Sequence, residues 1–97
     1  MRYEIILAPE ALHDLEELKA SLRPEVRDAI EQTLRHQPGR VSKSRIKRLR
    51  GLSHPQFRLR VGDVRVFYDI SGAEVHVLAI VSKGGAEDWL RRSGEPP

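Results

Sequence analysis

The sequence predicts an α+β domain of order β-α-α-β-β-β, in which an N-terminal helical hairpin packs on one face of a small, mostly antiparallel sheet. One observation behind this prediction is a helical period, because apolar residues recur at three- and four-residue spacing through residues 8–34. The other is a change to alternating apolar and polar residues over residues 57–81, with glycine-containing turns between the runs.

Length and composition set the limits of this domain. A chain of 97 residues has the usual size of one domain with one core, which we place at residues 1–92. Residues 93–97 are serine, glycine, glutamate and two prolines, and we expect a disordered tail there. The chain has no cysteine, no apolar run long enough to cross a membrane and no secretion signal. We therefore expect a cytoplasmic protein.

The first third of the chain supplies one strand and two helices. Residues 2–7 are rich in strand-forming side chains and predict the first strand. The helix that follows has an apolar stripe made of Ala8, Ala11, Leu12, Leu15, Leu18 and Leu22. Pro24 begins a second helix, whose stripe is Val26, Ala29, Ile30, Thr33 and Leu34. The short connection at residues 22–24 makes the two helices an antiparallel hairpin.

The second half of the chain is basic at first and then rich in strands. We expect irregular structure over residues 40–56, with a helical turn or two where apolar residues recur at Ile46, Leu49 and Leu52. Three strands are predicted after it, at Phe57–Val61, Val64–Ile70 and Glu74–Val81. Two-residue hairpin loops are expected between them, at Gly62-Asp63 and Ser71-Gly72.

The first of these loops fixes which residues face each other across the hairpin. A type II′ turn pairs Val61 with Val64, Arg60 with Arg65, Leu59 with Val66, Arg58 with Phe67 and Phe57 with Tyr68. Because successive side chains of a strand point to opposite faces, one face of the hairpin is apolar. The other face, called here the arginine face, carries Arg58, Arg60, Arg65 and Phe67.

The second loop, if it is Ser71-Gly72, extends this face to the last strand. It sets His76 opposite Phe67 and Leu78 opposite Arg65, so that His76 joins the arginine face.

Positive charge is concentrated in one third of the chain. Residues 35–65 hold ten basic residues and a single acid, a net of +9, whereas the segments on either side are net acidic. Such a concentration is typical of a surface that binds a polyanion. The alternative is an ordinary solvated run of charge.

Arg60 opposite Arg65 is a pair that a purely structural hairpin would avoid, because like charges facing each other destabilise a sheet. A bound phosphate would remove the repulsion, and the guanidinium fork suits phosphate oxygens. The alternative is that these arginines lie along the surface or pair with Asp69 and Glu74. Phe67 either stacks on a base or covers the sheet.

Two segments carry a resemblance to a known family. They are Lys47-Arg48-Leu49-Arg50-Gly51-Leu52 and Phe57-Arg58-Leu59-Arg60-Val61-Gly62-Asp63-Val64-Arg65-Val66-Phe67-Tyr68-Asp69. In these residues, and in the order of its elements over residues 2–90, the chain resembles the RelE/ParE toxin superfamily. For RelE-like members the resemblance implies a toxin of a type II toxin–antitoxin system that cleaves mRNA in the ribosomal A site without metal or other cofactor. It also implies the ribosome, mRNA and a cognate antitoxin as partners.

The resemblance assigns roles by position. The catalytic positions it implies are Arg58, Arg60, Arg65 and Lys83. We also predict that RNA is bound by Lys47, Arg48, Arg50, Phe67 and Trp89.

The chain departs from the family pattern at the positions expected to act as general acid and general base. Arginine is a very poor proton acceptor, and the tryptophan at position 89, where many members have tyrosine, cannot act as a general acid. Glu87 and His76 are the candidates for acid and base, against the plainer reading of each as structural or solvated. No pair of histidines has metal-ligand spacing, so we expect no metal.

Two other functions stay open. A poison of DNA gyrase, as in the ParE branch of the superfamily, would need no acid or base, because it acts by binding. A nucleic-acid-binding protein without toxicity would show salt-dependent RNA binding alone.

Overall fold

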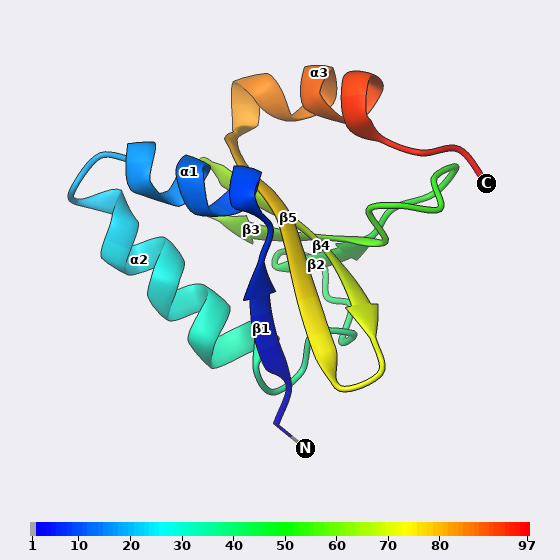
Figure 1. The fold of residues 1–97 in the computed structure, drawn as a ribbon, viewed down its shortest axis with the longest axis horizontal. Helices are drawn as coiled ribbons and strands as arrows, with labels where there is room; N and C mark the ends of the chain where they lie inside the picture. Colours follow the sequence, from blue (N-terminus) through cyan, green and yellow to red (C-terminus); the bar gives the residue numbers. More distant parts are fainter. Residues whose placement is uncertain (1) are drawn as a thin grey trace.

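A computed structural model describes residues 2–97 and shows a five-stranded sheet with helices on both faces (Figure 1). The elements are β1 (Glu4–Leu7), α1 (Pro9–Glu17), α2 (Leu22–Ala29) with its π-helical continuation η1 (Ile30–Leu34), β2 (Ile46–Arg48), β3 (Phe57–Val61), β4 (Val64–Ser71), β5 (Glu74–Ser82) and α3 (Lys83–Ser93). The strand order is β1-β5-β4-β3-β2, and all neighbours are antiparallel except β1 and β5. The predicted α+β class is confirmed, with one strand and one helix more than expected.

The additional strand, β2, replaces the helical turn expected in the basic segment. Ile46 is buried opposite Leu59, while Leu49 packs against side chains on the other face of the sheet. The three-residue spacing of these apolar residues therefore reflects two separate cores, and the expectation of a helical turn was wrong.

The additional helix, α3, lies on the face of the sheet opposite to α1 and α2. Its start is capped by Ser82, whose Oγ accepts a hydrogen bond from the backbone N–H of Gly85 at 3.2 Å. Two consecutive glycines and few apolar residues concealed this helix in the sequence. As predicted, the N-terminal helical hairpin covers one face of the sheet. The other face, which was expected to carry no helix, is covered by α3.

The helical hairpin turns earlier than predicted. α1 ends at Glu17 because Leu18 is extended, with ψ of 150°, and Leu22 begins α2 instead of ending α1. Pro24 lies in the first turn of α2, where its missing N–H costs no hydrogen bond.

The register of the β3–β4 hairpin is confirmed in full. All five predicted pairs are present, including Arg60 opposite Arg65, and Gly62 has the positive φ, 57°, that the first position of a II′ turn requires.

The predicted β4–β5 register was wrong. Gly72, with φ of 58°, is again the first loop residue, so the loop is Gly72-Ala73 and Ser71 pairs with Glu74. This loop sets His76 opposite Asp69, and a bulge between Phe67 and Tyr68 then shifts the register so that Phe67 faces Ala79.

Two cores lie on the two faces of the sheet. The larger one, between the sheet and the helices α1 and α2, includes the fully buried Leu59, Val66 and Val77. Tyr68 is buried there too, and its hydroxyl donates a hydrogen bond of 2.6 Å to the carbonyl of Pro38. Burial raises the pKa of this hydroxyl. The smaller core, under α3, is built on Phe67 and Trp89.

The end of the chain has a defined path, although the sequence predicts a disordered tail from residue 93. α3 continues through Ser93. Glu95 then forms backbone hydrogen bonds with Ser53 and His54 at 2.7 and 2.8 Å. Within residues 2–97, no helix combines the length and the apolar character needed to cross a membrane.

Asp14 is a polar link between α1 and the sheet. Its carboxylate accepts a hydrogen bond of 2.9 Å from the backbone N–H of Ile80, on the edge of β5 beyond the end of β1. Partial burial raises the pKa of this carboxyl, and the Ile80 hydrogen bond opposes that shift.

We predict that Asp14→Ala leaves the Ile80 amide without an acceptor and lowers the free energy of unfolding by about 1–3 kcal/mol. Asp14→Asn keeps an oxygen at the same place and should lose clearly less. Urea unfolding of the two variants measures the difference, and an alanine variant as stable as the wild type would contradict this role.

Candidate nucleic-acid interface

The arginine face is built by two cross-strand rows. Lys47 on β2, Arg58 on β3 and Phe67 on β4 lie side by side in the first row. Arg60 and Arg65 form the second row. Because residues two apart on a strand share a face, both rows point to the same side of the sheet, as predicted.

α3 crosses this face and closes one side of a groove. The groove has a volume of about 360 Å³ between the sheet and the helix. Its walls are formed by Lys47, Leu49, Arg58, Arg65, Phe67, Lys83, Ala86, Glu87 and Leu90. Six of the residues singled out from the sequence thus come together, namely Lys47, Arg58, Arg65, Phe67, Lys83 and Glu87.

Arg65 is the deepest cation of the groove. Its side chain is buried, 7% exposed, and donates hydrogen bonds to the carbonyls of Gly62 at 2.8 Å and Val64 at 3.2 Å. This guanidinium therefore does not lie free on the surface of the sheet. It lines the groove instead and is held in place by the turn.

Arg58 lies next to it and is half-buried. Its Nε is buried and has no hydrogen-bond partner within residues 2–97. Burial, followed by the charges of Arg65 and Arg60, lowers the pKa of the Arg58 guanidinium. Positive charges in the groove are therefore close together and partly removed from water, which is electrostatically unfavourable.

The nearby acids do not neutralise these cations. Asp69 pairs with His54 at 2.7 Å, and Glu74 with His76 at 3.0 Å. In the described part of the chain, none of the ion pairs involves a basic residue of the groove. The alternative in which the arginines pair with Asp69 and Glu74 is therefore contradicted.

Glu87 is the one acid in the groove wall, and it lies one helical turn beyond Lys83 on α3. This spacing puts both side chains on the same side of the helix. His76 is on the same face of the sheet but opposite Asp69, four residues along β4 from Arg65. That offset is about 13 Å of strand, so His76 lies outside the groove.

The two aromatic residues assigned to RNA stack on each other. The Phe67 and Trp89 rings lie 5.0 Å apart and nearly parallel, and they are 1% and 7% exposed. The indole N–H of Trp89 donates a hydrogen bond of 2.7 Å to Glu10 on α1. Stacking of Trp89 on a base does not fit this arrangement. Trp89 fixes α3 instead, and Phe67 forms the floor beneath it.

Three further basic residues lie outside the groove. Arg60 is exposed on the arginine face, above the groove rather than in its wall. Arg48 turns to the other side of the sheet, with its guanidinium carbon 5.0 Å from the centre of the Phe57 ring. Arg50 is exposed in the loop after β2. The predicted RNA-binding set is therefore divided between two faces.

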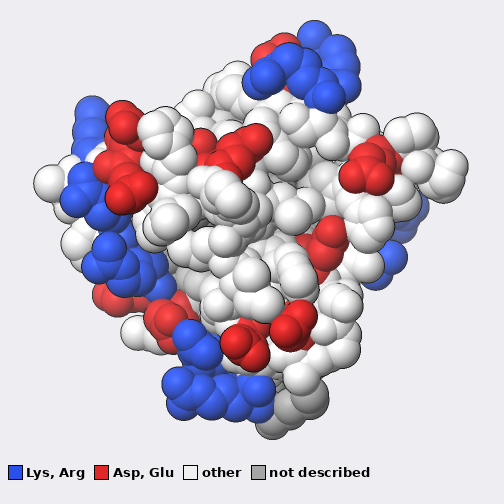
Figure 2. All heavy atoms as spheres, viewed as in Figure 1, with Lys and Arg blue, Asp and Glu red and all other residues white. Residues whose placement is uncertain are grey.

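The side of the molecule that carries α1, α2 and β1 has a different charge pattern. In the view onto α1, α2 and β1, carboxylates are interspersed with basic groups around a largely uncharged centre (Figure 2). Among residues 2–97, no cluster of three or more His, Asp or Glu side chains could hold a metal ion.

The role of Trp89 leads to a prediction. Trp89→Ala removes both the stack on Phe67 and the bond to Glu10, and should make α3 open more easily by roughly 3 kcal/mol. Trp89→Phe keeps a ring in place and should lose about 1 kcal/mol, the value of the hydrogen bond. Amide hydrogen exchange of residues 83–93 reports this opening. Equal protection of α3 in the wild type and the alanine variant would disprove the anchoring role.

Comparison with known proteins places this chain in a family. Residues 5–86 match the family described as the ParE toxin of type II toxin–antitoxin system, parDE. No curated protein matches the chain.

Solved structures share the fold. A chain of the toxin–antitoxin complex RelBE2 from Mycobacterium tuberculosis is 25% identical, with a TM-score of 0.70 over 84% of this chain and 92% of that one. A chain of the RelB–RelE complex from Methanococcus jannaschii is 19% identical, with a TM-score of 0.65 over 87% and 96%. A mutant of the Escherichia coli toxin RelE in the free state is 15% identical, with a TM-score of 0.57 over 96% and 99%. The chain therefore belongs to the ParE toxin family, and so to the RelE/ParE superfamily of type II toxin–antitoxin toxins.

Proposed function

We propose that this toxin is a metal-independent endoribonuclease that cleaves mRNA on the ribosome and so inhibits translation. The observation that carries the proposal is the groove under α3. It gathers Lys47, Arg58, Arg65 and Lys83, none of which is ion-paired within residues 2–97, and adds a single carboxylate, Glu87.

Cleavage without metal uses the 2′-hydroxyl of the RNA as the nucleophile. Its oxygen forms a bond to the adjacent phosphorus while the bond from phosphorus to the 5′-oxygen breaks. The products are a 2′,3′-cyclic phosphate and a free 5′-hydroxyl. The chain must therefore accept one proton, stabilise extra negative charge on the phosphate, and donate one proton.

The groove offers a group for each role. Glu87 accepts the proton of the 2′-hydroxyl, and Lys83, one turn away on α3, donates a proton to the leaving 5′-oxygen. Arg58 and Arg65 stabilise the pentacovalent phosphate. Arginine suits this role because it stays charged and donates two parallel hydrogen bonds.

Phosphate binding is also favoured because it reduces the charge repulsion among the groove arginines. Desolvation and two neighbouring arginines already make the charged form of Arg58 less favourable. A phosphate next to Arg58 and Arg65 supplies the missing negative charge.

The partners follow from the same surface. Several similar structures are described as antitoxin–toxin complexes. We propose that a cognate antitoxin lays an acidic or amphipathic segment over the groove and so keeps mRNA and the ribosome out.

A second candidate is inhibition of DNA gyrase, and the family match to ParE favours it. In that case the same cations act by binding alone. The carboxylate of Glu87 would then be dispensable.

The test of cleavage uses charge-neutralising variants of the groove. Arg58→Gln and Arg65→Gln should each reduce mRNA cleavage by about 10²–10³-fold, because each removes a donor that stabilises the transition state. Arg91→Gln is the matched control, since Arg91 is exposed on α3 and pairs only with Asp88. Cleavage is measured by primer extension on translating ribosomes, with thermal unfolding to verify that each variant is folded. Wild-type protein that leaves messages intact would contradict the proposal.

Glu87 separates the two candidate targets. Glu87→Gln should lower RNA cleavage by about 10²–10⁴-fold by removing the base, while leaving phosphate binding intact. A gyrase poison should inhibit supercoiling equally well with glutamine at this position. Inhibited supercoiling together with intact messages would assign the toxin to gyrase.

A further inference from the structure

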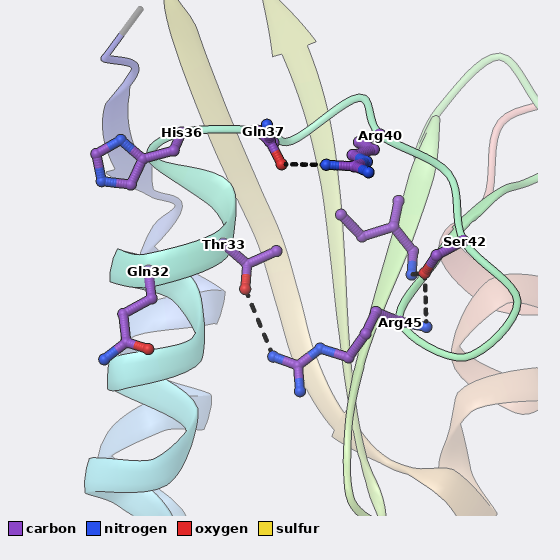
Figure 3. Close-up of a pocket in the computed structure, with 8 residues that line it drawn as sticks. Gln32, Thr33, His36, Gln37, Arg40, Ser42 and Arg45 are labelled. Atoms are coloured by element: carbon purple, nitrogen blue, oxygen red, sulfur yellow. Dashed lines mark hydrogen bonds between the residues drawn. The ribbon is translucent and has the colours of Figure 1, made fainter.

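A second basic pocket lies on the other side of β2 from the groove. It has a volume of about 250 Å³ and is formed between the end of η1 and the loop that leads into β2. Two guanidinium groups, an imidazole, two amides and two hydroxyls line it, and no carboxylate does. Figure 3 shows Thr33 on the helix and Arg40, Ser42 and Arg45 on the loop facing the space between these two segments.

The loop that carries the arginines is held in place. The Oγ of Ser42 accepts hydrogen bonds from the backbone N–H groups of Arg45 and Ile46, at 3.0 and 3.3 Å. The guanidinium of Arg45 reaches across to the hydroxyl of Thr33 at 3.5 Å (Figure 3). The pocket is therefore shaped before a ligand enters.

The charge of both arginines is unpaired. Within residues 2–97, the guanidinium of Arg40 donates only to the side-chain amide oxygen of Gln37, at 3.2 Å. Arg45 also borders a neighbouring hollow with Glu25 and Asp28 of α2. Neither carboxylate is within ion-pair distance of Arg45 in the described range, 2–97.

The pocket and the groove lie on opposite sides of β2, which is an edge strand of the sheet. Ile46 lines the pocket, and the next residue, Lys47, points to the opposite face and lines the groove. Residues 40–50 contain six basic residues and no acid. A chain of phosphates that leaves the groove at Lys47 therefore meets positive charge along the whole edge of the sheet.

We propose that the RNA strand bound in the groove continues over the β2 edge and places a backbone phosphate between Arg40 and Arg45. This inference rests on the proposed action on RNA and adds a second contact site to it. The amides and hydroxyls around the two arginines can bind the sugar hydroxyls next to that phosphate.

An acidic protein segment fits the pocket less well. Such a segment binds through an apolar face as well as through charge. The one apolar side chain in the wall, Ile46, is 2% exposed and offers no surface to it.

The test measures binding of single-stranded RNA oligonucleotides to protein silenced by Glu87→Gln, with and without Arg40→Gln and Arg45→Gln. For RNA long enough to reach both sites, the double variant should reduce the dependence of log affinity on log salt by about 0.7, the value for one lost phosphate contact. For RNA that fills only the groove, the double variant should bind with the same affinity and salt dependence as the parent protein. The matched control is Lys19→Gln with Arg27→Gln, which removes two exposed charges from the helical hairpin.

Several outcomes would overturn the inference. One is that the parent and the double variant bind long RNA with the same salt dependence. Another is that the control variant loses as much salt dependence as the double variant. A third is that the double variant loses affinity for polyglutamate, a probe for an acidic protein segment, but not for RNA. Displacement of the long RNA from this pocket by inorganic phosphate at low millimolar concentration would assign it to a free anion instead. A double variant that loses affinity for long RNA, alongside wild-type protein that cuts no message, would reject the cleavage proposal and retain the site.

Discussion

The central constraint on this structure is the electrostatic repulsion among three arginines that no carboxylate of the described residues neutralises. Arg58, Arg60 and Arg65 share one face of two paired strands, and two of them are directly opposite each other. Nearby carboxylates pair with histidines instead. Burial of Arg65 and partial burial of Arg58 strengthen the interaction, because charges screened less by water repel more strongly. A folded domain keeps such a cluster at a cost in stability, and an anionic ligand offsets that cost.

α3 turns this charged surface into a groove. Without the helix, the arginine face would be an open sheet, on which a phosphate is fully exposed to water. The stack of Trp89 on Phe67 and its hydrogen bond to Glu10 fix the helix at a height that leaves room for Lys83 and Glu87 above the arginines. The aromatic residues thus contribute indirectly, by setting the distance between two charged walls.

Features of the fold that depend on neighbouring residues could be predicted from the sequence. Glycine at the first position of the β3–β4 loop fixed the register, and with it the face shared by the arginines. The same rule applied to Gly72 would have placed the second loop correctly, since only glycine readily adopts the positive φ required there. By contrast, the bond between Glu10 and Trp89 joins residues 79 apart, and no local pattern predicts it. The burial of Trp89 followed from that long-range contact and could not be inferred from its neighbours.

The binding of phosphate by Arg58 can be observed directly in the NMR signals of arginine Nε–H groups. Glu87→Gln protein would be titrated with a short single-stranded RNA while these signals are followed. The Arg58 signal should shift strongly, because a phosphate in the groove places a negative charge next to this guanidinium. The Arg65 signal should shift with it, and that of the exposed Arg91 should stay unchanged. RNA binding that leaves the Arg58 and Arg65 signals unmoved would show that the groove is not where phosphate binds.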